Sequence, residues 1–146
     1  MRTMKIIATF GIVSLALFAC KNQTNADEAK FMDEAWLDEI ELNQNEPWNA
    51  DLVTNNGVEK LKQVLDEFQT TSLKDYHQLA NQLININNYI IDNCTMEGAS
   101  HDNLHIWLQA LLEKVSELKQ ASSVAEAEEL KASIEFSVNQ YSTYFQ

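Results

Sequence analysis

Apolar residues recur at helical spacing through most of this chain, and very few residues interrupt them. The 146-residue sequence contains only three glycines and one proline. These two residues are the strongest helix breakers, whereas Leu, Glu, Lys, Gln and Ala, which are abundant here, favour helix. The sequence therefore predicts an all-α protein with no sheet.

Four segments each carry one apolar stripe, at about 51–68, 72–98, 100–120 and 123–146. Their spacing of three and four residues is typical of a helix with one buried face. Ser72 with Asp75 and Ser123 with Glu126 match capping boxes. The stripes consist of Val58, Leu61, Leu65 and Phe68; Tyr76, Leu79, Leu83, Ile86 and Ile90; Leu104, Leu108, Leu111, Val115 and Leu118; and Ala127, Leu130, Ile134, Val138, Tyr141 and Phe145.

The connections between these segments are short, which makes consecutive helices antiparallel neighbours. We therefore expect residues 47–146 to form one domain, an up-down-up-down four-helix bundle. A three-helix body with a loose first segment is the alternative. In the bundle, the start of the first helix and the end of the fourth lie at the same pole as the connection between helices two and three.

The N-terminal residues have the layout of a bacterial export signal. Arg2 and Lys5 precede an apolar run that is too short to span a bilayer. The following "LFAC" looks like a lipobox, which predicts a lipoprotein signal peptide over 1–19 and lipidation of Cys20. An ordinary signal peptide cut near Ala19 is the alternative.

Two further segments separate this signal from the bundle. Residues 20–30 are polar and unpatterned, which indicates a flexible tether. Residues 31–46 place apolar side chains among acids, which predicts a short amphipathic helix outside the bundle, with Pro47 at the boundary. We expect a lipid-anchored protein of the bacterial envelope, and Lys21 after the cysteine favours the outer membrane.

The charge of the chain restricts its partners. The formal net charge is −12 at pH 7, and loss of the signal peptide would remove two basic residues. An acidic surface repels phosphate backbones, so nucleic acid is an unsuitable partner. Attachment to a membrane would come from the acyl chains.

The stretch "CTMEGASHDNLH" at 94–105 gathers soft side chains in twelve positions. His101 and His105, one helical turn apart, project from one face and can bind one ion. With Cys94 and Met96 they form a soft ligand set for Cu(I) or, without Met96, for Zn(II). Glu97 or Asp102 could replace Met96 for Zn(II).

The same spacing fits a purely structural role, in which Cys94 and Met96 fill the end of the core and His101 covers it. Cys94 and His101 could also pair as nucleophile and base. No orienting group or oxyanion site accompanies them, so we expect no enzyme. The rival to metal binding is a metal-independent adaptor that contacts another envelope protein through the acidic helix at 31–42.

Three segments, "PWNADLVTNNGVEKL", "CTMEGASHDNLHIWLQALLEKV" and "YSTYFQ", carry a family resemblance. Together they resemble a group of small uncharacterised bacterial envelope lipoproteins with a C-T-M-x-G-x-x-H-D-x-L-H motif. The resemblance spans about 47–146 and implies a helical bundle. It implies no activity, and any carried-over ligand role would fall on Cys94, Met96, His101 and His105.

Overall fold

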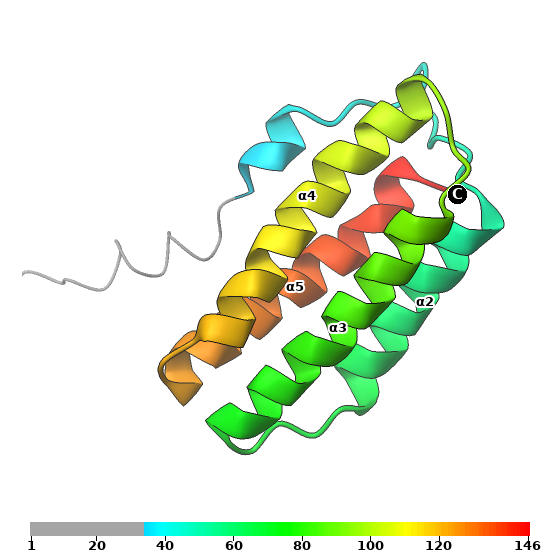
Figure 1. Ribbon diagram of the computed structural model, residues 1–146. Helices are drawn as coiled ribbons and strands as arrows, with labels where there is room; N and C mark the ends of the chain where they lie inside the picture. The colour runs from blue at the N-terminus through cyan, green and yellow to red at the C-terminus, as the bar shows by residue number, and fades with distance from the viewer. Residues whose placement is uncertain (1–33) are drawn as a thin grey trace, which may run out of the picture.

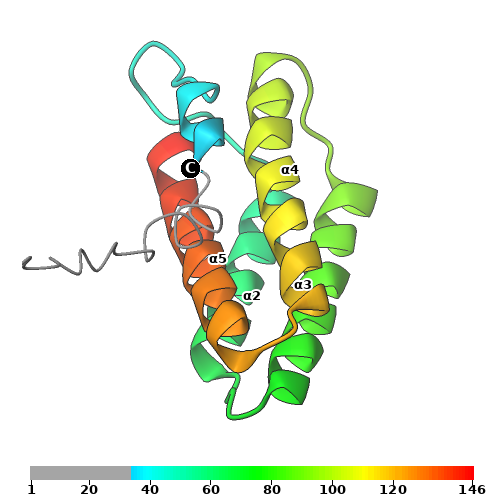
Figure 2. The same cartoon turned by 90° about the vertical axis from the view of Figure 1, so that its left-hand side faces the viewer.

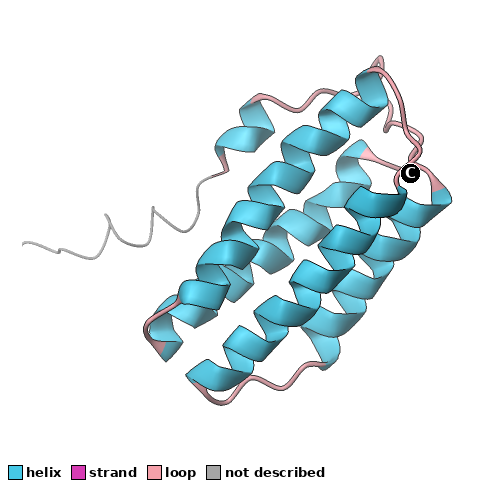
Figure 3. Cartoon of the chain, in the orientation of Figure 1, coloured by secondary structure: helices cyan, strands magenta, loops and turns pink. Residues whose placement is uncertain are grey.

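The structure is a computed structural model that describes residues 34–146 (Figure 1). The predicted signal peptide, Cys20 and the predicted tether lie outside the described residues. The described elements are a 3₁₀ turn and four helices: η1 (Ala35–Asp38), α2 (Leu52–Glu67), α3 (Leu73–Asn93), α4 (Ala99–Gln120) and α5 (Val124–Tyr144). Residues 34–146 contain two isolated β-bridges and no strand (Figure 3).

The four helices form an antiparallel, up-down-up-down bundle (Figures 1 and 2). Each helix packs against the next in the chain, and α5 also packs against α2. This arrangement confirms the predicted all-α bundle. The alternative with a loose first segment is wrong, because Val58 and Leu61 of α2 are fully buried in the common core.

The core consists largely of the predicted stripes. Leu83, Leu111 and Ile134 are inaccessible to solvent and Leu108 is nearly so. Two stripe positions, Phe68 and Ile86, are only half-buried against the core, and Asn87 beside Ile86 is buried instead. The amide of Asn87 has no hydrogen-bond partner among the described residues. Its burial depends on how α3 is rotated in the bundle, which the apolar pattern alone cannot fix.

Capping side chains mark the starts of three helices, and two of these caps were predicted from the sequence. Asp51 caps α2 by accepting a hydrogen bond from the backbone N–H of Thr54. Ser72 and Asp75 form the predicted reciprocal capping box at α3. At α5, the Ser123 hydroxyl accepts from the backbone N–H of Glu126. Local side chains therefore define where three of the four helices begin.

The connection between α3 and α4 differs from the sequence prediction. Helix α3 ends at Asn93 rather than near Gly98, and Gly98 is instead the N-cap of α4, which begins at Ala99. The physical reason is a long-range bond: the backbone N–H of Thr95 donates to the Asp51 carboxylate over 2.6 Å. That N–H therefore cannot donate to a carbonyl of α3, and the chain leaves the helix in an extended conformation at Cys94. Gly98 then turns the chain with a positive φ of 66°.

Residues 34–50, which we call the N-terminal arm, cross the bundle before α2 begins (Figure 2). Within 34–46 the expected amphipathic helix is a single 3₁₀ turn, η1. Trp36 and Ile40 of the arm are buried in the common core. Further along, the backbone of Trp48 donates to Tyr144 over 2.7 Å and accepts from Gln146 over 2.9 Å. The arm is thus an integral part of the fold.

Within residues 34–146, no helix has the length and apolar character needed to span a bilayer.

Candidate functional site

Residues 94–105 lie at one pole of the bundle, together with the start of α2 and the end of α5, as the predicted topology requires. Asp51, at the start of α2, accepts hydrogen bonds from both the backbone N–H and the hydroxyl of Thr95. The Tyr141 hydroxyl of α5 donates to the side-chain oxygen of Asn55 on α2 over 2.9 Å. Segments far apart in the sequence therefore meet at this end of the bundle.

The two sulfur atoms of the motif lie beside one buried hydroxyl. Thr54 Oγ1 is 3.8 Å from Cys94 Sγ and 3.9 Å from Met96 Sδ. Thr54 is fully buried, whereas the unpaired Cys94 and Met96 are half-buried. The extended backbone after Asn93 turns both sulfur atoms toward α2, so they form one soft pair.

Two ionisable groups beside the sulfur pair, Asp51 and Tyr141, have shifted pKa values. Partial burial opposes ionisation of Asp51, but hydrogen bonds from Thr95 and Thr54 outweigh it and lower its pKa to about 2. Burial raises the pKa of Tyr141 well above its ordinary value, and the nearby Asp51 and Cys94 raise it further. The tyrosine therefore stays neutral, and it cannot supply a phenolate ligand or base at neutral pH.

The two histidines of the motif form a second pair on α4. The ring centroids of His101 and His105 are 4.3 Å apart, with the planes inclined by 69°. His101 is half-buried and His105 is exposed. No group of three or more His, Cys, Asp or Glu side chains within 34–146 is placed to hold a metal ion. The predicted ligands are thus arranged as a sulfur pair and an imidazole pair, rather than around one centre.

His77, the third histidine, lies at the opposite pole. One of its ring nitrogens, Nε2, is 3.0 Å from the backbone carbonyl oxygen of Ala121. This contact joins the start of α3 to the end of α4, which is a structural role.

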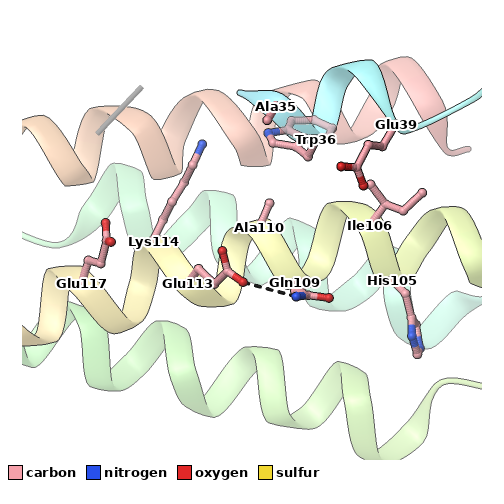
Figure 4. A pocket seen from close by; sticks show the side chains of 10 residues that line it. All are labelled: Ala35, Trp36, Glu39, His105, Ile106, Gln109, Ala110, Glu113, Lys114 and Glu117. Carbon is pink, nitrogen blue, oxygen red and sulfur yellow. Dashed lines mark hydrogen bonds between the residues drawn. The ribbon is translucent and has the colours of Figure 1, made fainter. Parts of the chain in front are cut away.

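A second candidate site, absent from the sequence-based prediction, lies between the N-terminal arm and α4 (Figure 4). It is a groove of about 510 Å³. We call it the arm groove and define it by its lining residues: Ala35, Trp36, Glu39, His105, Ile106, Gln109, Ala110, Glu113, Lys114 and Glu117. Figure 4 shows Glu113, Lys114 and Glu117 rising from α4 on the side that faces the arm, whereas His105 points away from it.

Lys114 fixes the arm against the bundle beside this groove. Its side chain is only 8% exposed, and Nζ donates to Glu34 Oε1 over 2.9 Å and to Ser137 Oγ over 2.8 Å. The other oxygen of Glu34 accepts from the Trp36 indole N–H over 2.7 Å. The lysine charge is therefore matched by a carboxylate, as a buried charge must be.

The arm groove was not predicted from the sequence, because the arm has no strong periodic pattern. One signal was present: Lys114 lies three residues after Leu111 and four before Leu118, on the face of the third stripe, and a lysine that is buried there needs an acidic partner. Nothing in the sequence indicated that the partner would be Glu34, 80 positions away.

Comparison of the chain with protein-family models, with curated proteins and with solved structures found no match.

Proposed function

We propose that the protein is a non-catalytic adaptor of the bacterial envelope, which holds another protein in the arm groove. The observation that carries this proposal is the groove itself. It combines half-buried apolar side chains, Ile106 and Ala110, with exposed carboxylates along one face of α4. Protein-binding sites typically combine an apolar centre with a polar rim, and the arm groove has this composition.

The anchor for such an adaptor would be a lipid on Cys20, which is followed by the polar tether. The tether predicted at residues 20–30 precedes the N-terminal arm in the sequence. A partner bound in the arm groove would then contact the segment nearest to the membrane attachment.

From the sequence alone, we predicted that the partner contacts apolar residues of the 31–42 segment. In the described part of that segment, Trp36 and Ile40 face the core and hold the arm in place. We therefore assign the contact to the arm groove, where the arm supplies one wall and α4 the other.

Site-directed photocrosslinking in membranes tests the adaptor proposal. A photoreactive amino acid at Gln109, inside the groove, should capture a defined protein. The same residue at Gln82, exposed on α3, is the matched control and should not. Equal capture at both positions, or none at Gln109, would refute the proposal.

A second candidate function is soft-metal binding, for metal buffering or delivery. Two observations favour it: the imidazole pair of His101 and His105, and the sulfur pair of Cys94 and Met96. A rotation of side chains in the extended 94–98 segment would be needed to bring a sulfur ligand to the imidazoles. Because thiolate and neutral imidazole are required, acid should weaken binding.

Titration of the purified chain with Cu(I) and with Zn(II) tests this second candidate. The His101→Ala/His105→Ala variant serves as the comparison. Equal and weak binding by both proteins would make the motif structural and leave the adaptor function as the conclusion.

A further inference from the structure

The arm groove has an unbalanced negative charge. Its carboxylates, Glu39, Glu113 and Glu117, are all exposed. None of them takes part in an ion pair within residues 34–146, and Glu113 accepts only a hydrogen bond from Gln109. The one lysine that lines the groove is already neutralised by Glu34.

Two of these carboxylates are placed where they disfavour the folded helix. Glu113 and Glu117 are four residues apart on α4, so their like charges repel each other. Glu117 also lies in the last turn of α4, which ends at Gln120, where the helix dipole disfavours negative charge. A cation bound between them would relieve both effects.

The shape of the groove sets the length of a ligand. Its lining residues on α4 run from His105 to Glu117, about 18 Å along the helix axis at 1.5 Å per residue. Ile106 and Ala110 provide apolar contact along this line, with Glu39 at one end and Glu117 at the other. This pattern matches a short peptide segment in which basic side chains flank apolar ones.

We infer that the arm groove binds a basic, amphipathic segment of a partner protein, through ion pairs to Glu39, Glu113 and Glu117. This inference rests on the proposed adaptor function and specifies the chemistry of the partner. The chain's own residues 21–33 are a poor match, because their two lysines are outnumbered by Asp27, Glu28 and Asp33.

The test is calorimetric titration of the purified full chain with a synthetic peptide of about 12 residues, the length of a helix that spans the groove. The peptide carries lysines at helical spacing around leucines, and its matched control has every lysine replaced by glutamine. The lysine peptide should bind and the glutamine peptide should bind at least about tenfold more weakly, since the exposed ion pairs are lost. Added salt should weaken the lysine peptide only.

Two charge-matched variants locate the binding surface. Glu113→Gln/Glu117→Gln should weaken the lysine peptide about tenfold. Glu128→Gln/Glu129→Gln, which removes the same charge from exposed positions of α5 outside the groove, should change affinity less than about twofold. Amide chemical-shift changes on binding should centre on Ile106 and Ala110.

Three results would overturn the inference: equal affinity for the two peptides, an equal loss of affinity for the lysine peptide in the two variants, or amide chemical-shift changes centred on another face of the bundle. Binding only after deletion of residues 21–33 would also overturn it, because the chain's own segment would then be the occupant. If Gln109 still captures a partner while the lysine peptide fails, the basic chemistry is wrong and the adaptor function stands. If both experiments fail, both proposals are refuted.

Discussion

The ion pair that joins the N-terminal arm to the bundle allows a quantitative test of the structure. Replacement of Lys114 by Met keeps the length of the side chain and removes its charge. Glu34 would lose its 2.9 Å partner and keep only the hydrogen bond from Trp36, and Ser137 would lose a donor. The variant therefore leaves a largely buried carboxylate without a counter-charge.

The expected cost lies between two reference values. Breaking a fully buried ion pair costs about 3–5 kcal/mol, whereas an exposed pair contributes about 0.2–1 kcal/mol. The side chains of Lys114 and Glu34 are 8% and 18% exposed, so water can reach the orphaned carboxylate in part. We expect Lys114→Met to lower the free energy of unfolding by about 2 kcal/mol.

Urea denaturation followed by circular dichroism measures this change. The matched control is Lys62→Met, which breaks a 3.0 Å pair with Glu59 whose side chains are 30% and 72% exposed. It should cost below about 0.5 kcal/mol. In the double variant Glu34→Gln/Lys114→Met no charge is left unpaired, so its loss should be smaller than the sum of the single losses by at least about 1 kcal/mol. The reasoning is refuted if Lys114→Met costs no more than Lys62→Met, or if the two single losses simply add.

Three further predictions concern helix packing, acid stability and the anchor. Gly57→Ala should lower the free energy of unfolding by about 1 kcal/mol, since a methyl group there would lie 2.7 Å from Ile90 Cδ1, and an overpacking cost of about 2 kcal/mol exceeds the gain in helix propensity of about 1 kcal/mol. In an Ile90→Ala background, urea denaturation should show no such cost, and a persistent cost would contradict the predicted clash. The pKa of Asp51 in the folded protein, about 2, lies below the ordinary 3.8, so the ionised carboxylate stabilises the fold above about pH 4. This contribution of about 1–2 kcal/mol should disappear as the pH falls to about 2. An Asp51→Ala variant that loses as much stability over that pH range as the wild type would exclude this role. Labelled fatty acid should be incorporated into the wild-type chain and not into Cys20→Ser, which should leave the membrane fraction; absence of label in the wild type would rule out the lipid anchor.

The histidines and cysteine of the 94–105 motif show how far sequence spacing can specify a site. Spacing along one helix correctly placed His101 and His105 together, because residues four apart share a face. Spacing could not place Cys94, which lies beyond the end of α3. Its position depends on the Asp51 carboxylate, which binds the backbone of Thr95 and diverts the chain toward Thr54.

The sequence by itself determined the fold class, the order of the four helices and the starts of three of them. These features follow from local causes: the spacing of apolar residues, the near absence of glycine and proline, and capping side chains within a few positions of the backbone that they bind. Local causes act between residues whose separation the sequence states directly.

Only the tertiary structure decided the N-terminal arm and the groove beside it. The arm is held by Lys114 bonding Glu34 across 80 positions, by Asn103 bonding the backbone of Glu41 across 62, and by Trp48 pairing with the C-terminal end of the chain. Such contacts form only after the bundle has brought their partners together, so no periodic pattern encodes them. The arm groove arises from these contacts, because one of its walls is the arm and the other is α4.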